Sequence, residues 1–150
     1  MKFEQFEVGA RFHTAPYLMQ LEEILQFAST YDPHYYHTDI EKAEKSLFGS
    51  IVASGMHTVV VSNREWVRLG LLEEDMLGGL GIDVRWTAPV FPGDRIRSEV
   101  EVLEKRERDE TSGVVTFGFT GFNQNDEVWA KVKIKVVVAR EQAAVLSERA

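Results

Sequence analysis

The feature that most constrains this chain is a change in the period of its apolar residues partway along the sequence. Beyond about residue 79, apolar and polar residues alternate, most clearly in residues 128–138, where Lys131, Lys133 and Lys135 separate apolar neighbours. Alternation with period two indicates antiparallel strands that have one face buried and the other in water. Up to about residue 72, apolar residues instead recur every three or four positions, which indicates helices.

The same alternation predicts three further strands, at residues 79–86, 95–102 and 115–119. Residues 107–113 and 123–126 contain the Asp, Asn, Ser and Gly residues that are typical of the turns between strands. The second half of the chain is therefore expected to form one antiparallel sheet.

The first half is expected to hold a short N-terminal strand and three helices. The helix at residues 21–31 should end at Asp32-Pro33, because proline disfavours helical geometry in the residue before it. Thr38 and Glu41 match a capping box, which predicts a short helix to about Ser46. The third helix should be mostly buried, with one face formed by Met56, Val59, Val60, Asn63, Val67 and Leu71.

Helices followed by a run of strands predict an α+β domain with an antiparallel sheet. The concave face of a curved sheet would cover the long apolar helix. We find no internal repeat or linker, and 150 residues, 44% of them hydrophobic, suffice for one domain over residues 1–150.

Composition argues against several classes of protein. The chain has no cysteine, which removes disulfide frameworks and thiolate zinc sites and fits a cytoplasmic protein. A net charge of −7 argues against nucleic acid as a partner. We expect no membrane association, since the start does not resemble a signal peptide and no apolar stretch approaches about 20 residues. Only His34 and His37 are close in sequence, so no metal site is predicted.

Asp32 and His37 are the strongest candidates for catalysis. They lie five residues apart in a predicted loop between helices, where a carboxylate and an imidazole can jointly hold one water and move its protons. On spacing alone, the commoner alternative is that Asp32 ends a helix and His37 packs near the next.

Ser54, Gly55 and Met56 are the candidates for substrate binding. They stand at the predicted start of the apolar helix, where free amide groups and a partial positive charge can bind a carbonyl oxygen. The alternative is a serine N-cap followed by a glycine that is needed only for tight packing. The segment at residues 89–94 is read as a turn between strands.

Taken together, these segments resemble the MaoC-like family, which includes the (R)-specific enoyl-CoA hydratases and related dehydratases. The resemblance covers nearly the whole chain. The segments that carry it are residues 6–9, 27–28, 48–56 and 89–94, together with Asp32, His37 and Ala43. His34 and Tyr35 stand where the family signature usually has an amide residue and then proline, and Ser62 or Asn63 lies near its helical serine.

The resemblance implies a hotdog fold, a homodimer or multiple of dimers, and an acyl-thioester tunnel near the subunit interface. It implies a hydratase or dehydratase of 2-enoyl thioesters that uses Asp32 and His37, with coenzyme A only as part of the substrate and no other cofactor. Two alternatives stay open. A thioesterase on the same fold would not need His37, and a non-catalytic acyl-thioester-binding subunit would need neither residue.

Overall fold

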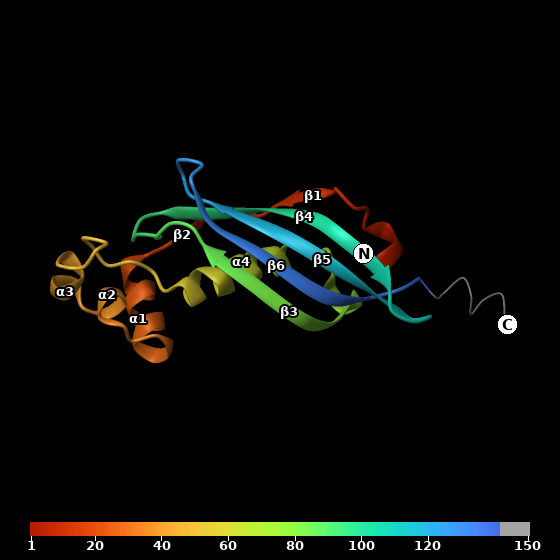
Figure 1. The fold of residues 1–150 in the computed structure, drawn as a ribbon, viewed down its shortest axis with the longest axis horizontal. Helices are drawn as coiled ribbons and strands as arrows, with labels where there is room; N and C mark the ends of the chain where they lie inside the picture. The colour runs from red at the N-terminus through yellow and green to blue at the C-terminus, as the bar shows by residue number, and fades with distance from the viewer. Residues whose placement is uncertain (142–150) are drawn as a thin grey trace.

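The computed structural model describes residues 1–141 of the chain; residues 142–150 of the predicted domain lie outside the described part. One curved antiparallel sheet dominates the molecule (Figure 1). Its strands are β1 (Arg11–His13), β2 (Tyr17–Leu18), β3 (Met76–Trp86), β4 (Arg95–Glu107), β5 (Ser112–Phe122) and β6 (Val128–Ala139). They run in the order β1-β4-β5-β6-β3, with β2 paired to β4, so β3 forms one edge.

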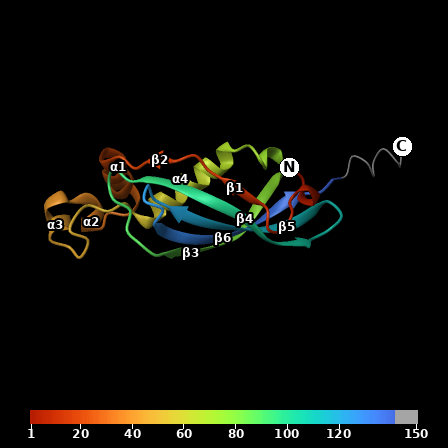
Figure 2. The same cartoon turned by 90° about the horizontal axis from the view of Figure 1, so that it is seen from above.

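The longest helix, α4 (Gly55–Arg68), lies against one face of this sheet (Figures 1 and 2). The helices α1 (Leu21–Tyr31), α2 (Tyr35–Thr38) and α3 (Ile40–Glu44) gather at one end of the sheet. Two 3-10 turns, Phe3–Gln5 and Glu73–Asp75, complete the elements of the described chain. The predicted α+β arrangement, a curved antiparallel sheet against a long helix, is confirmed.

The core lies between α4 and the sheet. The predicted inward side chains of β4, which are Ile96, Ser98, Val100 and Val102, are all buried, as are Phe117 and Phe119 of β5. Trp66 of α4 joins the two layers, since its ring centre lies 4.9 Å from that of Phe117 and 5.6 Å from that of Phe119. The three lysines of β6 point to solvent, as their alternation predicted.

The predicted buried face of α4 is wrong. Met56, Val60 and Val67 are 60%, 50% and 65% exposed. The residues that α4 buries are instead His57, Thr58, Val61, Glu65 and Trp66. Apolar periodicity identifies a face that avoids water, but it does not say whether the chain's own sheet or another surface covers that face.

The boundaries of two elements also differ from the prediction. The short helix α3 begins after Asp39, whose side chain accepts a hydrogen bond from the Lys42 amide at 3.0 Å, and not after Thr38. Thr38 belongs to α2, an unpredicted helical turn, and its hydroxyl donates to the His34 carbonyl. Strand β3 begins at Met76, slightly before the predicted start.

No helix within residues 1–141 combines the length and the apolar character that crossing a membrane requires.

Candidate active site

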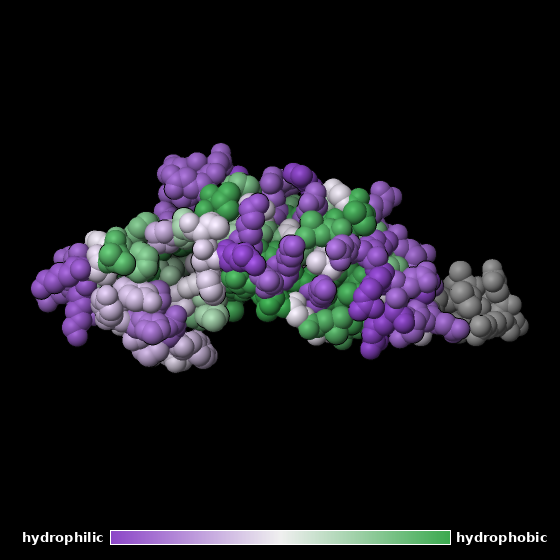
Figure 3. All heavy atoms as spheres, in the orientation of Figure 1, coloured by the Kyte–Doolittle hydropathy of each residue, from purple (hydrophilic) through white to green (hydrophobic). Residues whose placement is uncertain are grey.

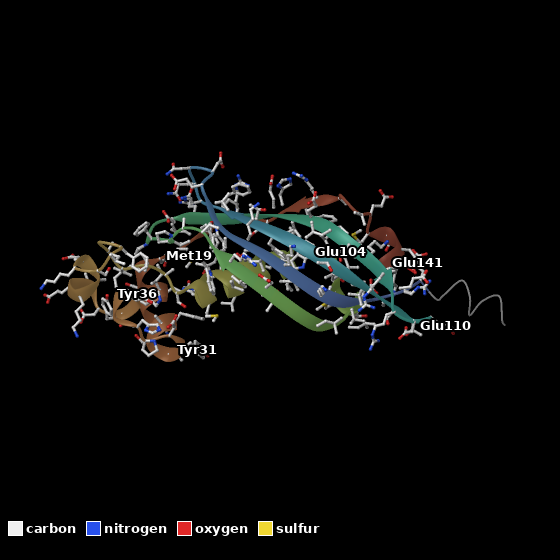
Figure 4. All side chains as sticks on the ribbon, in the orientation of Figure 1. Met19, Tyr31, Tyr36, Glu104, Glu110 and Glu141 are labelled. Carbon is white, nitrogen blue, oxygen red and sulfur yellow. The ribbon has the colours of Figure 1, made fainter. Side chains whose placement is uncertain are left out.

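A cavity of about 510 Å³ opens at the N-terminal end of α4. Its walls come from the α1–α2 connection, the first turn of α4, and the residues that follow β3. Both predicted catalytic residues line it, as do Gly55, Met56 and Trp86. Asp32 and His37 come from the helical end of the molecule, where Tyr31 and Tyr36 are labelled in Figure 4.

Asp32 is held at the end of α1. It is the C-cap residue, and its amide donates to the Ala28 carbonyl at 2.8 Å, so Pro33 begins the next segment without breaking a helical turn. The Oδ2 atom of Asp32 accepts a hydrogen bond from the Ser54 hydroxyl at 2.7 Å. The carboxylate is partly exposed on the cavity side, with 23% of its side chain accessible.

His37 lies in α2 and is buried. Its Nδ1 atom lies 2.6 Å from the Val52 carbonyl oxygen, which can only accept, so Nδ1 carries a proton. This contact leaves Nε2 as the nitrogen that faces Asp32, at 3.5 Å from Oδ2. A separation of 3.5 Å is too long for a strong direct hydrogen bond, so both atoms can interact with a third molecule.

His34 is a neighbour of Asp32 that the sequence argument did not place in the site. Its Nε2 atom lies 3.5 Å from Asp32 Oδ1, whereas His37 faces the other oxygen, Oδ2. The ring stacks on Tyr36 with the planes 10° apart and is largely exposed. The sequence feature that could have predicted this placement is the position of His34, two residues after Asp32 in the same loop.

The first turn of α4 has free amide groups. Ser54 is the N-cap residue, but its hydroxyl donates to Asp32 and does not cap the helix. Within residues 1–141, the amides of Gly55 and Met56 have no hydrogen-bond acceptor. Such unpaired amides at a helix N-terminus attract negative charge. The side chain of Met56 is exposed at the rim of the cavity.

Gly55 has a packing reason that needs no ligand. A Cβ atom at this position would collide with the ring of Trp86, and the Trp86 Nε1–H donates to the Gly55 carbonyl at 3.2 Å. A larger residue here would displace Trp86, so tight packing by itself already requires a glycine at this position. The binding role of the Gly55 amide stays a prediction.

The segment at residues 89–94 forms a turn between strands, as predicted, and Pro89 and Val90 also line the cavity. Asp94 Oδ2 accepts from the Phe91 amide at 2.8 Å, and Gly93 has a positive φ of 92°. The Val90 carbonyl accepts from the Ala53 amide, which fixes the chain that enters α4. As for metals, residues 1–141 contain no cluster of three or more histidine or acidic side chains able to hold an ion.

The sequence model of the MaoC-like domain matches residues 4–121. The chain belongs to the MaoC-like family. The uncharacterised protein YdeM of Bacillus subtilis is 31% identical over 93% of this chain and 100% of its own length. A MaoC-like dehydratase from Rhodospirillum rubrum is 35% identical, with a TM-score of 0.87 over 94% of this chain and 98% of its own.

A third relative of this MaoC-like protein is an Archaeoglobus protein described as a monoamine oxidase regulatory protein. It is 32% identical, with a TM-score of 0.89 over 94% of this chain and 95% of its own. The described residues thus have the hotdog fold of the MaoC-like family, as the resemblance implied, and the family supports hydratase or dehydratase chemistry in broad terms.

Proposed function

We propose that this chain catalyses the reversible addition of water to a 2-enoyl thioester, with Asp32 and His37 as its catalytic pair. One observation carries the proposal. Asp32 Oδ2 and His37 Nε2 face each other at 3.5 Å in the wall of a cavity that also contains the first turn of α4. The relationship to a MaoC-like dehydratase supports it.

The hydrogen bonds of the pair suit the activation of one water. The Val52 carbonyl keeps the proton of neutral His37 on Nδ1, so Nε2 presents a lone pair, and ionised Asp32 is also an acceptor. A water beside them donates one hydrogen to each residue. Its oxygen lone pair is then free to attack the substrate.

In the hydration direction, the water oxygen forms a bond to C3 while Asp32 accepts one proton. The electrons of the C2=C3 double bond move toward the thioester carbonyl as enolate charge. The proton then passes from Asp32, along the hydrogen bonds that His37 helps to arrange, to C2. One water is consumed, no electron is gained or lost, and coenzyme A enters only as part of the substrate.

The free amides of Gly55 and Met56 would bind the thioester carbonyl oxygen as its negative charge grows. The positive end of the α4 dipole adds to this stabilisation. Removing a single donor of this kind typically costs about 2.7–4 kcal/mol of transition-state stabilisation. The Ser54 hydroxyl favours this role because it leaves the amides uncapped.

We further propose that the protein is a homodimer or a multiple of dimers. The exposed face of α4 and the edge strand β3 together present a set of apolar side chains: Met56, Val60, Val67, Leu77, Leu80 and Ile82. Hydrophobic side chains reach the surface along the β3 edge in Figure 3. An uncovered strand edge with exposed apolar residues is suited to pairing with another chain.

An apolar cavity of about 430 Å³ lies beside this face, lined by residues that include Trp66, Val67 and Ile82. A second copy on the face would enclose the cavity, whose apolar walls suit an acyl chain.

Mixing the purified protein with crotonyl-CoA tests the proposed reaction. Loss of the enoyl absorbance without release of free thiol is the expected result. Release of free thiol would instead establish a thioesterase. Absence of turnover with enoyl-CoAs of several chain lengths would overturn the catalytic proposal in favour of a binding subunit.

A further inference from the structure

We propose that His57, held by Glu23, is a positioning residue that sets the place of Asp32 relative to the first turn of α4. The inference rests on the proposed function, because it concerns the same catalytic pair. His57 is 2% exposed and lies two residues after Gly55, yet it is not among the residues that line the dyad cavity. It lines a separate depression between α1 and α4.

A network of polar side chains joins three elements at this point. His57 Nε2 lies 2.9 Å from Glu23 Oε1, and the Tyr17 hydroxyl donates to Glu23 Oε2 at 2.7 Å. Partial burial opposes ionisation of Glu23, but the hydrogen bonds from Tyr17 and His57 outweigh it and lower the pKa of Glu23. The carboxylate of Glu23 therefore accepts from both partners, and Arg64 lies nearby, over the Tyr17 ring.

The His57 ring is held in one orientation. Its Nδ1 atom is buried and has no hydrogen-bond partner among residues 1–141. A proton on Nδ1 would be a buried donor without an acceptor, so the proton lies on Nε2 and is donated to Glu23. Phe27 stacks on the ring, with centres 4.5 Å apart and planes 10° apart. Both contacts come from α1.

The helix α1 is consequently attached to the first turn of α4 near both of its ends. Glu23 bonds to His57 near the start of α1, and Asp32 accepts from Ser54 at its end. The two attachments are about 13 Å apart along the helix axis, at 1.5 Å per residue. Because a helix moves as a rigid unit, loss of the Glu23 attachment changes the angle between α1 and α4. This change strains the remaining Ser54–Asp32 bond and displaces Asp32 from the free amides.

A buried histidine stabilises the fold less than an apolar side chain of similar size would, if it only fills space. An apolar side chain would fill the same volume without a desolvation cost and without an unpaired nitrogen. What the polar network adds is a defined geometry between α1 and α4. The position of Asp32 relative to the free amides of α4 depends on this geometry.

Three variants separate positioning from stability. His57→Phe keeps an aromatic ring against Phe27 but removes the donor, whereas His57→Gln places an amide donor near the position of Nε2. Val61→Ala, one turn further along α4, removes buried volume without touching a polar group. For His57→Phe we expect kcat on crotonyl-CoA to fall on the order of 10²-fold with KM little changed, since a displacement of about 1 Å has effects of this size.

His57→Gln should recover most of the lost kcat, and Val61→Ala should lower the melting temperature while kcat stays near that of the wild type. If His57→Phe keeps wild-type kcat and differs only in melting temperature, His57 is structural and the proposal is wrong. Equal losses of kcat in His57→Phe and Val61→Ala would overturn it as well.

Crystal structures of the same variants make the geometric claim independent of the reaction. We expect the Ser54–Asp32 hydrogen bond to be lost in His57→Phe and kept in His57→Gln and Val61→Ala. If the wild type does not hydrate enoyl-CoA but this bond is lost as expected, the proposed function fails and the positioning role stands. An unchanged Ser54–Asp32 bond in His57→Phe overturns the positioning role, whatever the activity.

Discussion

The Ser54 hydroxyl donates its hydrogen bond to Asp32 Oδ2, at 2.7 Å, and not to the amides of the helix that Ser54 begins. A serine at an N-cap normally accepts from the amide two or three residues later and stabilises its helix. Here the same side chain instead orients a carboxylate and leaves the first-turn amides unpaired. One residue thereby links the two halves of the proposed site, the acid–base pair and the carbonyl-binding amides.

Loss of this hydroxyl should affect turnover more than stability. We expect Ser54→Ala to lower kcat on crotonyl-CoA about tenfold or more, because hydrogen bonds to charged groups contribute about 1.5–3 kcal/mol. The melting temperature should fall only modestly, because one bond between α1 and α4 is lost but no capping bond is lost with it. Ser29→Ala is a matched control, because its hydroxyl donates to the Leu25 carbonyl and neither residue lines the cavity. A large drop in melting temperature with unchanged kcat would contradict this reading.

The catalytic pair makes a sharper prediction. Asp32→Asn keeps the shape of the side chain but removes its charge, and His37→Ala removes the second group that holds the water. Each change should lower kcat by a factor on the order of 10²–10⁴. The double variant should be little worse than the worse single variant, because groups that act as a unit are not additive.

Turnover rates and melting temperatures of these three variants provide the measurement. Multiplicative losses with unchanged melting would argue against a shared water. Full activity of His37→Ala would exclude the hydratase mechanism and favour a thioesterase that depends on Asp32 alone.

The exposed face of α4 makes a prediction about assembly. Val67 is 65% exposed on this face, and Val67→Glu should convert a dimer to a monomer at micromolar concentration, because burying an unpaired charge is costly. Lys131→Glu also introduces a carboxylate, on the outer face of β6, and should leave the dimer intact. Sedimentation equilibrium checks both variants, and a wild-type chain that sediments as a monomer would disprove the assembly.

The β4–β5 turn predicts a pH dependence of stability. Asp109 accepts hydrogen bonds from the amides and hydroxyls of Thr111 and Ser112, which lower its pKa from 3.8 to about 2. A lowered pKa in the folded state stabilises the fold above the unfolded pKa, and this contribution is lost as pH falls through the folded value.

Asp109→Asn should therefore be less stable than the wild type near neutral pH, and the difference should shrink between about pH 4 and pH 2. Thermal unfolding of both proteins across this range is the measurement. Glu110→Gln is the control, because the Glu110 side chain makes no hydrogen bond within the described residues. A difference that does not change with pH would show that the charge of Asp109 has no part in it.

Local patterns were sufficient to predict the sheet and the proximity of Asp32 to His37. Alternation of apolar and polar residues depends only on which face of a strand meets water, so β4, β5 and β6 follow directly from it. Asp32 and His37 lie five residues apart across one helix end, and so short a connection limits how far apart the side chains can be.

Contacts between distant segments were decided only by the tertiary structure. The Ser54–Asp32 and His57–Glu23 bonds join residues 22 and 34 positions apart, and the collision that requires glycine at position 55 involves Trp86 of another element. The buried side of α4 likewise could not be predicted from the periodicity of its apolar residues. An amphipathic pattern records which residues avoid water, whereas the surface that covers them depends on how α1, α4 and the sheet pack together in three dimensions.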